Sequence, residues 1–249
     1  EIETNIDAKA RELAAQGKLG DLCEGMPFGE RLTHLCAAVD DDAARAELWH
    51  IGHGKHHMTA GMFAVWTHPA LVDAAEQVLG PEILAHPQYN LRAKLPNQWE
   101  TVVPWHQDLG YLQRDADETF MLNFWIPLVN APMETGAMQV IPGSHRWELL
   151  PHERVDGYDG VREENLPAHE VVDCPLPLGG ALLIQSRTMH RSVPNTSQAI
   201  RWSLDLRYCD SRKPTGRAGV PGFVVRSEAA PERVVRDWRD WAALFENGE

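Results

Sequence analysis

The sequence lacks the features that mark several large classes of protein. No stretch approaches the ~18 consecutive apolar residues of a membrane-spanning helix, so we expect no membrane partner. No run of lysine and arginine is present, and the net charge is −13. Nucleic acid is therefore not an expected partner either, because its binding relies on clustered positive charge.

Cysteine is scarce and scattered. The four residues stand far apart, with no CxxC pair: Cys23, Cys36, Cys174 and Cys209. This spacing argues against a disulfide framework and is typical of reduced thiols. We therefore expect a cytoplasmic protein.

The chain does have enough apolar material for a sizeable core. Its 249 residues are 43% apolar, a usual share for a globular protein. Nine tryptophans fit either dense packing or an aromatic-lined ligand cavity. We expect one domain with three parts: a mostly helical part over residues 1–82, a β core over residues 83–210, and a loop and helix over residues 211–249.

The first part carries helical patterns. Residues 8–15 are good helix formers and stop near a glycine, and further helices are predicted over residues 28–39 and 41–49. Another helix begins at Pro69, a residue favoured in the first helical turn, and stops at a Gly-Pro pair. Its apolar stripe predicts that it packs on a sheet.

From about residue 83 the apolar period changes from 3.6 to 2, which indicates strands. Residues 86–95 alternate between a polar and an apolar face, and residues 119–126 alternate again. Residues 146–168 are polar and irregular, which predicts a loop. Further short strands are predicted at residues 137–141, 171–172 and 181–185. Many short strands separated by Pro and Gly indicate an all-β sandwich or barrel.

A His-x-Asp motif, His106 to Asp108, is the first candidate for chemistry. Alternate residues of a strand point to the same face, so both side chains could reach one metal ion. A third ligand must come from elsewhere, and the best candidate is His190. Two histidines and one carboxylate form the facial triad of non-haem Fe(II) oxygenases, which leaves coordination positions open.

A second group of histidines offers a rival metal site. His50, His53, His56 and His57 lie close together around two glycines. The stretch has no carboxylate or cysteine nearby, and its glycines predict an ordinary loop. The His-x-Asp motif is therefore the preferred metal site.

Arg201 is predicted to lie beside His190. Residues 194–197, Pro-Asn-Thr-Ser, are typical of a turn, and a turn centred there makes a hairpin in which His190 and Arg201 are directly opposed, with Ser192 on the same face. A buried arginine needs an anion, and a carboxylate suits it. An open metal site beside such an arginine describes a site for a dicarboxylate such as 2-oxoglutarate. The alternative is an ion pair of Arg201 with an acidic residue on the sheet surface.

Together these motifs resemble the phytanoyl-CoA dioxygenase family of Fe(II)/2-oxoglutarate-dependent oxygenases. The resemblance covers roughly residues 65–230. It rests on Trp-His-Gln-Asp at residues 105–108, on Glu-Thr-Gly-Ala-Met-Gln-Val-Ile-Pro-Gly-Ser-His at residues 134–145, on His-Arg-Ser from His190, and on Arg201 eleven residues beyond that histidine. It implies a mainly β fold, a double-stranded β-helix (jelly roll, cupin-like) with flanking helices.

The resemblance also implies roles for single residues. It implies that iron is held by His106, Asp108 and His190. It implies that Arg201 and Ser192 bind the distal carboxylate of 2-oxoglutarate, with Trp125 lining the same pocket. It further implies a polar co-substrate contact from the strand at residues 86–95, where the candidates are Gln88, Asn90 and Arg92.

The implied activity is that of a dioxygenase. It uses Fe(II), 2-oxoglutarate and O₂ to hydroxylate or otherwise oxidise a small-molecule substrate, with release of succinate and CO₂, as a monomer or homodimer. Related halogenases have a small residue in place of the carboxylate ligand, so that chloride binds iron, and Asp108 therefore implies hydroxylase-type chemistry. Two other hypotheses stay open: a cupin-like module that binds metal or 2-oxoglutarate without turnover, and a structural β-sandwich with surface His and Arg.

Overall fold

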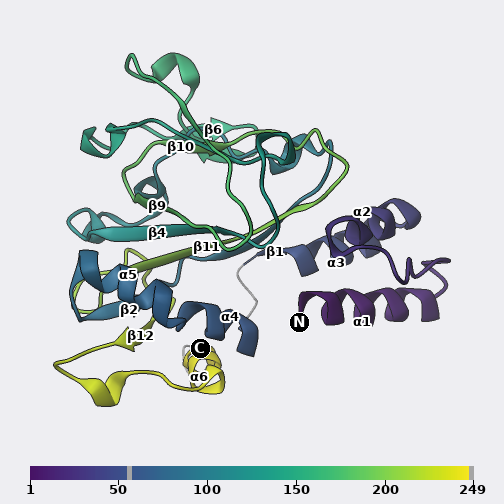
Figure 1. The fold of residues 1–249 in the computed structure, drawn as a ribbon, viewed down its shortest axis with the longest axis horizontal. Helices are drawn as coiled ribbons and strands as arrows, with labels where there is room; N and C mark the ends of the chain where they lie inside the picture. Colours follow the sequence, from purple (N-terminus) through teal and green to yellow (C-terminus); the bar gives the residue numbers. More distant parts are fainter. Residues whose placement is uncertain (55–57, 247–249) are drawn as a thin grey trace.

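Antiparallel sheets form the centre of the computed structural model, which describes residues 1–54 and 58–246 (Figure 1). The largest sheet is built around one long strand, β11, which pairs with β2, β3 and β4. Its strands are β1 (His53–Gly54), β2 (Ile83–Ala85), β3 (Asn90–Lys94), β4 (Met121–Pro127), β9 (Leu182–Gln185), β11 (Arg201–Asp210) and β12 (Phe223–Arg226).

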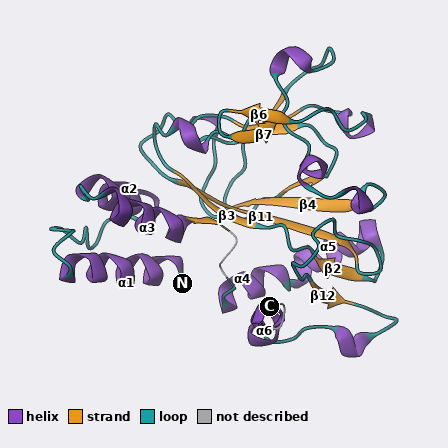
Figure 2. Cartoon of the chain, turned by 180° about the vertical axis from the view of Figure 1, so that it is seen from behind, coloured by secondary structure: helices purple, strands orange, loops and turns teal. Residues whose placement is uncertain are grey.

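A second, smaller layer lies across one face of this sheet (Figures 1 and 2). It contains the three-stranded sheet of β5 (Met138–Val140), β8 (Val172–Cys174) and β10 (His190–Ser192), and the hairpin of β6 (Glu153–Val155) and β7 (Tyr158–Gly160). Two facing antiparallel layers are the arrangement of a jelly roll. The space between them is where the candidate site lies.

Helices flank the large sheet on its other side and at one end (Figure 2). They are α1 (Ile2–Ala15), α2 (Phe28–Ala38), α3 (Asp42–Gly52), α4 (Ala60–Trp66), α5 (Pro69–Leu79) and α6 (Trp238–Glu246). The four predicted helices are confirmed, and α5 packs on β2, β4 and β11 as expected. Helix α3 begins where it does because the Asp41 side chain accepts the backbone N–H of Ala44.

Short 3₁₀ turns connect many of these elements: η1 (Trp99–Thr101), η2 (Asp108–Tyr111), η3 (Arg114–Ala116), η4 (Met133–Thr135), η5 (Ser144–Arg146), η6 (Glu163–Asn165) and η7 (Pro231–Arg233). The main core lies between the large sheet and the helices, where Trp66, Trp202 and Trp241 are buried together. These three tryptophans thus serve packing in the core. No helix in the described part of the chain is long and apolar enough to cross a membrane.

The predicted hairpin between His190 and Arg201 is wrong. Strand β10 pairs with β5, with His190 opposite Val140, whereas β11 pairs with β3, with Arg201 opposite Lys94. The residues between them cross from one layer to the other. The Asn195 side chain fixes this crossing, because its amide donates to the backbone carbonyls of Lys94 and Ala199.

Two further expectations need correction. The stretch predicted as a loop contains the β6–β7 hairpin, whose turn has Asp156 and Gly157 at φ of 47° and 87°. Positive φ at both central residues is what a tight hairpin turn requires. The strand expected from residue 86 begins only at Asn90, and Asp108 opens η2 instead of continuing a strand.

Candidate metal centre and co-substrate pocket

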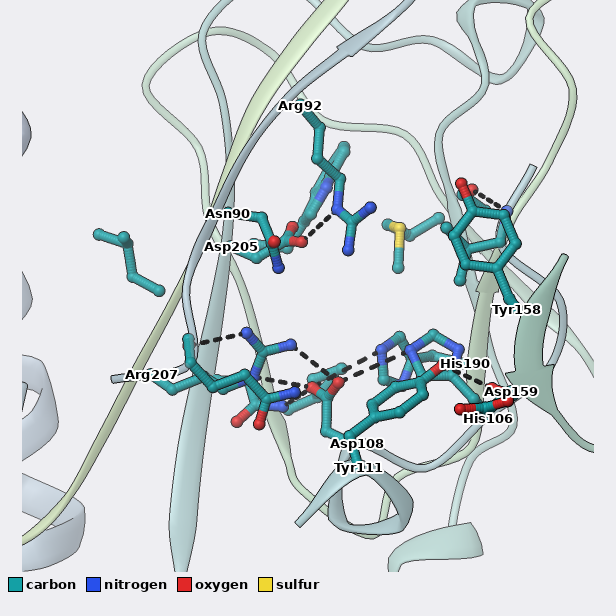
Figure 3. Close-up of a pocket in the computed structure, with 18 of the residues that line it drawn as sticks. Asn90, Arg92, His106, Asp108, Tyr111, Tyr158, Asp159, His190, Asp205 and Arg207 are labelled. Atoms are coloured by element: carbon teal, nitrogen blue, oxygen red, sulfur yellow. Dashed lines mark hydrogen bonds and ion pairs between the residues drawn. The ribbon is translucent and has the colours of Figure 1, made fainter. Parts of the chain in front are cut away.

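Three buried side chains meet between the two layers: His106, Asp108 and His190 (Figure 3). His106 Nε2 lies 3.6 Å from Asp108 Oδ1, and His190 Nε2 lies 3.9 Å from Asp108 Oδ2. One potential ligand atom from each residue lies within 4.8 Å of the other two. One ion of ordinary size could therefore contact all three.

The backbone brings the two histidines together directly. His106 and His190 exchange both N–H···O bonds, at 3.0 and 3.1 Å, in an isolated antiparallel bridge. The chain then turns into η2, which swings Asp108 toward the same point. Gln107 faces the other way, where its side-chain amide donates to the carbonyl of Arg187 at 2.9 Å. His106 and Asp108 thus reach the same point as expected, but through a β-bridge and a 3₁₀ turn and not along a regular strand.

The histidine rings present the nitrogen that a metal would need. Nδ1 of His106 lies 2.9 Å from the carbonyl of Pro104, and Nδ1 of His190 lies 2.8 Å from that of Thr188. A carbonyl only accepts, so each Nδ1 carries the hydrogen and each Nε2 directs a lone pair toward Asp108. Burial lowers the pKa of His190 to about 4, which keeps this ring neutral at pH 7.

Asp108 has two partners that the sequence did not reveal. Arg207 in β11 grips both carboxylate oxygens, with Nη2 2.8 Å from Oδ1 and Nε 3.1 Å from Oδ2. The Asn123 amide, from β4, also donates to Oδ2. Burial alone would raise the pKa of the Asp108 carboxyl, but the positive charge of Arg207 holds it well below its usual range. The carboxylate is therefore charged and fixed in direction.

Arg201 lies in the same cavity and has no carboxylate in contact with it in the described part of the chain. It is 2% exposed. Its guanidinium donates to the carbonyl of Gly136 at 3.2 Å and to Ser203 Oγ, and stands 5.3 Å from the centre of the Trp125 ring. Burial lowers its pKa to about 10, so the side chain keeps its charge at pH 7. Ser192 lines the cavity close by.

The family model for phytanoyl-CoA dioxygenase matches residues 30–203. The chain belongs to the phytanoyl-CoA dioxygenase family.

Several named proteins are similar to this chain in sequence. The chain is 26% identical to 1-deoxypentalenic acid 11-beta-hydroxylase of Streptomyces arenae, over 57% of this chain and 55% of that one. It is 30% identical to phytanoyl-CoA dioxygenase domain-containing protein 1 of Bos taurus, over 61% and 53%. The chain thus spans about half the length of these relatives. L-Proline trans-4-hydroxylase of Streptomyces griseoviridis is 26% identical over 72% of this chain and 74% of its own.

Solved structures with the same fold support the architecture. The apo form of the non-heme monooxygenase ThoJ superimposes with a TM-score of 0.63 at 23% identity, over 96% of this chain and 85% of that one. EctD from S. alaskensis with 2-oxoglutarate and 5-hydroxyectoine gives 0.56 at 23% identity, over 74% and 67%. The expected jelly-roll fold with flanking helices is confirmed.

In this family member, the three candidate co-substrate contacts on and before β3 all line the cavity: Gln88, Asn90 and Arg92. They differ in whether their side chains already have a bonding partner within the protein. Arg92 is held in an ion pair, with Nε 2.5 Å from Asp205 Oδ2. The Gln88 side-chain oxygen is buried without a partner in the described part of the chain. Figure 3 shows Asn90, Arg92 and Asp205 facing the histidines and Arg207 across open space.

The cavity itself holds about 260 Å³. Its floor comes from β3, β4 and β11, and its roof includes Tyr158 and Asp159 from the β6–β7 hairpin. Trp125 lines it, as expected, beside apolar contacts such as Met138 and Ile184. The site is therefore a mixed polar and apolar pocket of the kind that takes small ligands.

The rival histidine group does not form a second centre in the described part of the chain. His56 and His57 lie outside the described residues. His53 lies in β1 opposite Arg92, with its ring stacked on Trp49 at 3.9 Å between centroids. Burial lowers its pKa to about 3. Among the described residues, only the triad brings three metal-binding side chains together.

Proposed function

We propose that this chain is an Fe(II)- and 2-oxoglutarate-dependent dioxygenase of the hydroxylase type. The observation that carries the proposal is the buried group of His106, Asp108 and His190, with both Nε2 lone pairs directed at the carboxylate. Two imidazoles and one carboxylate suit Fe(II) and leave positions open for other ligands. Membership of the phytanoyl-CoA dioxygenase family supports the same activity.

In this proposal the residues divide the work along the cavity. His106, Asp108 and His190 hold the iron, while Arg201, Ser192 and the Trp125 ring hold the distal carboxylate of 2-oxoglutarate. Iron and 2-oxoglutarate, when bound, supply the oxidising chemistry with O₂, and succinate and CO₂ are released.

Among the three candidate contacts from the β3 region, we propose Gln88. Its buried side-chain oxygen has no partner among the described residues, whereas the Arg92 Nε is engaged by Asp205. A buried amide oxygen without a partner is unfavourable, so a ligand that donates a hydrogen bond to it gains affinity. Gln88 also lies beside the metal end of the cavity, because its backbone carbonyl accepts Arg207 Nη1 at 3.0 Å.

The proposed substrate is a small molecule. The cavity of about 260 Å³ must hold the co-substrate and the part of the substrate that reacts. Two relatives are named for small molecules, 1-deoxypentalenic acid and L-proline, which supports this size class. The four cysteines are free thiols, which supports a reducing compartment such as the cytoplasm as the proposed location.

The deciding experiment measures iron and succinate together. We expect the protein, loaded with Fe(II) without oxygen, to bind one iron per chain and to convert 2-oxoglutarate to succinate when O₂ is admitted, more rapidly with a substrate from a screen. His106→Ala should abolish both, because one of three ligands is lost. The matched control is His53→Ala, which removes a partly buried histidine outside the triad.

Each other hypothesis predicts a different result. A binding or sensing module would take up iron and 2-oxoglutarate without any succinate. A structural β-sandwich would bind no stoichiometric iron. Iron that survives His106→Ala but is lost with His53→Ala would place the metal at the other histidine group.

A further inference from the structure

A lysine is buried behind the proposed carboxylate site. Lys94 ends β3 directly opposite Arg201 in β11 and is 1% exposed. Its Nζ donates to Ser192 Oγ at 2.7 Å and to the carbonyl of Val193. The approach is tight, because a Cβ added at Gly136 would lie 2.5 Å from Lys94 Cδ. Ser192 and Arg201 reach the cavity, and Lys94 lies behind them.

No acidic side chain compensates Lys94 in the described part of the chain. The charged groups that act on it are Arg201 from β11 and Arg92 from β3, both positive, and Asp205 is bonded to Arg92. The β10 side offers only the Ser192 hydroxyl and a backbone carbonyl. Burial, reinforced by the two arginines, lowers the pKa of Lys94 to about 6. In the free protein at pH 7 the side chain is therefore mostly a neutral amine.

The state of Lys94 decides what Ser192 can do. Ser192 Oγ already accepts the backbone N–H of Val103 at 3.1 Å. A neutral Lys94 has a lone pair that can accept the Ser192 hydrogen. A charged Lys94 has three donors and no acceptor, so the Ser192 hydrogen must point elsewhere. The remaining open direction is the cavity that Ser192 lines.

We propose that Lys94 is a positioning residue for 2-oxoglutarate. In this proposal the Lys94 amine takes up one proton when the distal carboxylate of 2-oxoglutarate binds at Arg201 and Ser192. The inference rests on the proposed function. The proton comes from solvent and bonds to the Nζ lone pair, and Ser192 keeps its own hydrogen but turns it toward the carboxylate. The incoming negative charge stabilises the new ammonium, and the ammonium strengthens the hold on the carboxylate through Ser192.

This coupling has a defined pH dependence. Below the pKa of Lys94 in the free protein the amine is already charged, so binding takes up little proton. Above it, each binding event takes up nearly one proton until the pKa of the bound form is reached. Linkage then lowers the affinity for 2-oxoglutarate by up to about tenfold per pH unit.

The test is anaerobic titration calorimetry of 2-oxoglutarate into the Fe(II)-loaded protein. The same titration is run in two buffers with different ionisation enthalpies, and the difference in heat gives the protons taken up. We expect nearly one proton at about pH 7.5 and well under half a proton at about pH 5.5. Lys94→Met should take up none at either pH. Lys213→Met removes one positive charge from an exposed position and should behave like the unmutated protein.

Two results would overturn the inference: no proton uptake by the unmutated protein at the higher pH, or equal uptake by Lys94→Met. If Lys94→Met does not fold, the comparison of the two pH values in the unmutated protein decides alone. A failure of every form to bind 2-oxoglutarate would instead refute the proposed function, and this inference with it.

Discussion

Arg207 is the counter-ion of Asp108. Its removal should make the free energy of unfolding depend on pH in a new way and should increase the stabilisation that a bound metal ion gives. Arg207→Leu leaves the 1%-exposed carboxylate without a positive partner, and the Asn123 amide is its remaining hydrogen-bond donor among the described side chains. Breaking a buried pair in this way typically costs about 3–5 kcal/mol. In the unmutated protein the pKa of Asp108 is depressed, so its stabilisation exists above the unfolded pKa of about 4 and disappears as pH falls through the folded pKa.

In the variant the sign reverses. Burial, no longer opposed by Arg207, should raise the pKa of Asp108 above its unfolded value, so that the variant loses stability as pH rises. The gap in unfolding free energy between the two proteins should therefore be smallest below the folded pKa of Asp108 in the unmutated protein, and should widen with rising pH by up to about 1.4 kcal/mol per pH unit until it levels off. Urea unfolding of the metal-free proteins at several pH values measures this gap.

A divalent ion should rescue the variant. Co(II) at the triad supplies the positive charge that Arg207 gave, so saturating Co(II) should stabilise Arg207→Leu more than the unmutated protein. The matched control is Arg92→Leu, which breaks the partly buried ion pair of Arg92 with Asp205 in the same cavity. Co(II) should not repair that loss. Equal stabilisation of all three proteins by Co(II) would refute the reasoning, because the metal would then not compensate the Asp108 charge.

Three further outcomes are expected. Arg201→Ala should keep its iron but bind 2-oxoglutarate more weakly, on the order of a hundredfold or more, because the loss of a buried charged partner costs about 3–5 kcal/mol and each tenfold in affinity is 1.4 kcal/mol. Arg201→Lys should restore the affinity only in part, because it lacks the planar guanidinium. Unchanged affinity of Arg201→Ala in anaerobic titration would mean that another base, such as Arg92, holds the co-substrate. Turnover in high chloride should give hydroxylated or desaturated product by mass spectrometry, because Asp108 occupies the position that a halide needs, and a chlorinated product would contradict this. The pKa of Lys94 is depressed to about 6, so between pH 7 and 9 the unfolded chain holds a proton that the folded chain lacks. As pH rises over this interval, the free energy of unfolding of the metal-free unmutated protein, measured with urea, should increase by up to about 3 kcal/mol relative to Lys94→Met. A difference that stays constant with pH would speak against a neutral buried amine.

The sequence could predict the triad because its signal is local. His106 and Asp108 are two residues apart, and the position of His190 followed from motifs around it. The backbone brings these side chains together in a different way from the one expected, because a β-bridge and the 3₁₀ turn η2 replace a regular strand. A two-residue spacing therefore restricts where side chains can meet, but it does not specify the backbone that brings them there.

Arg201 reached the expected cavity by a route that the sequence did not indicate. Turn residues such as Asn195 predict that the chain reverses, but they do not say whether the next strand joins the same sheet. Here β11 joins the opposite layer. Its polar face still meets His190, because the two layers of the jelly roll face one cavity.

The partners of the proposed site residues were not predictable. Alternation along β11 puts Arg207 on the same face as Arg201, but its partner Asp108 lies 99 positions away in the chain. Lys94 likewise meets Ser192 over 98 positions. Such pairs depend on the register between strands, which the sequence pattern leaves undetermined. The Asp-Gly turn of β6–β7, by contrast, was a local signal that could have been used.

The charges of the cavity show where a ligand charge is missing. Asp108 balances Arg207, and Asp205 balances Arg92. Arg217 also lines the cavity but is partly exposed, so water can solvate its charge. Arg201 is 2% exposed and has neither a carboxylate nor free access to solvent. A 2-oxo acid without a distal carboxylate would leave this buried charge uncompensated. That cost is the physical basis on which we expect the site to select 2-oxoglutarate over 2-oxo acids that lack a distal carboxylate.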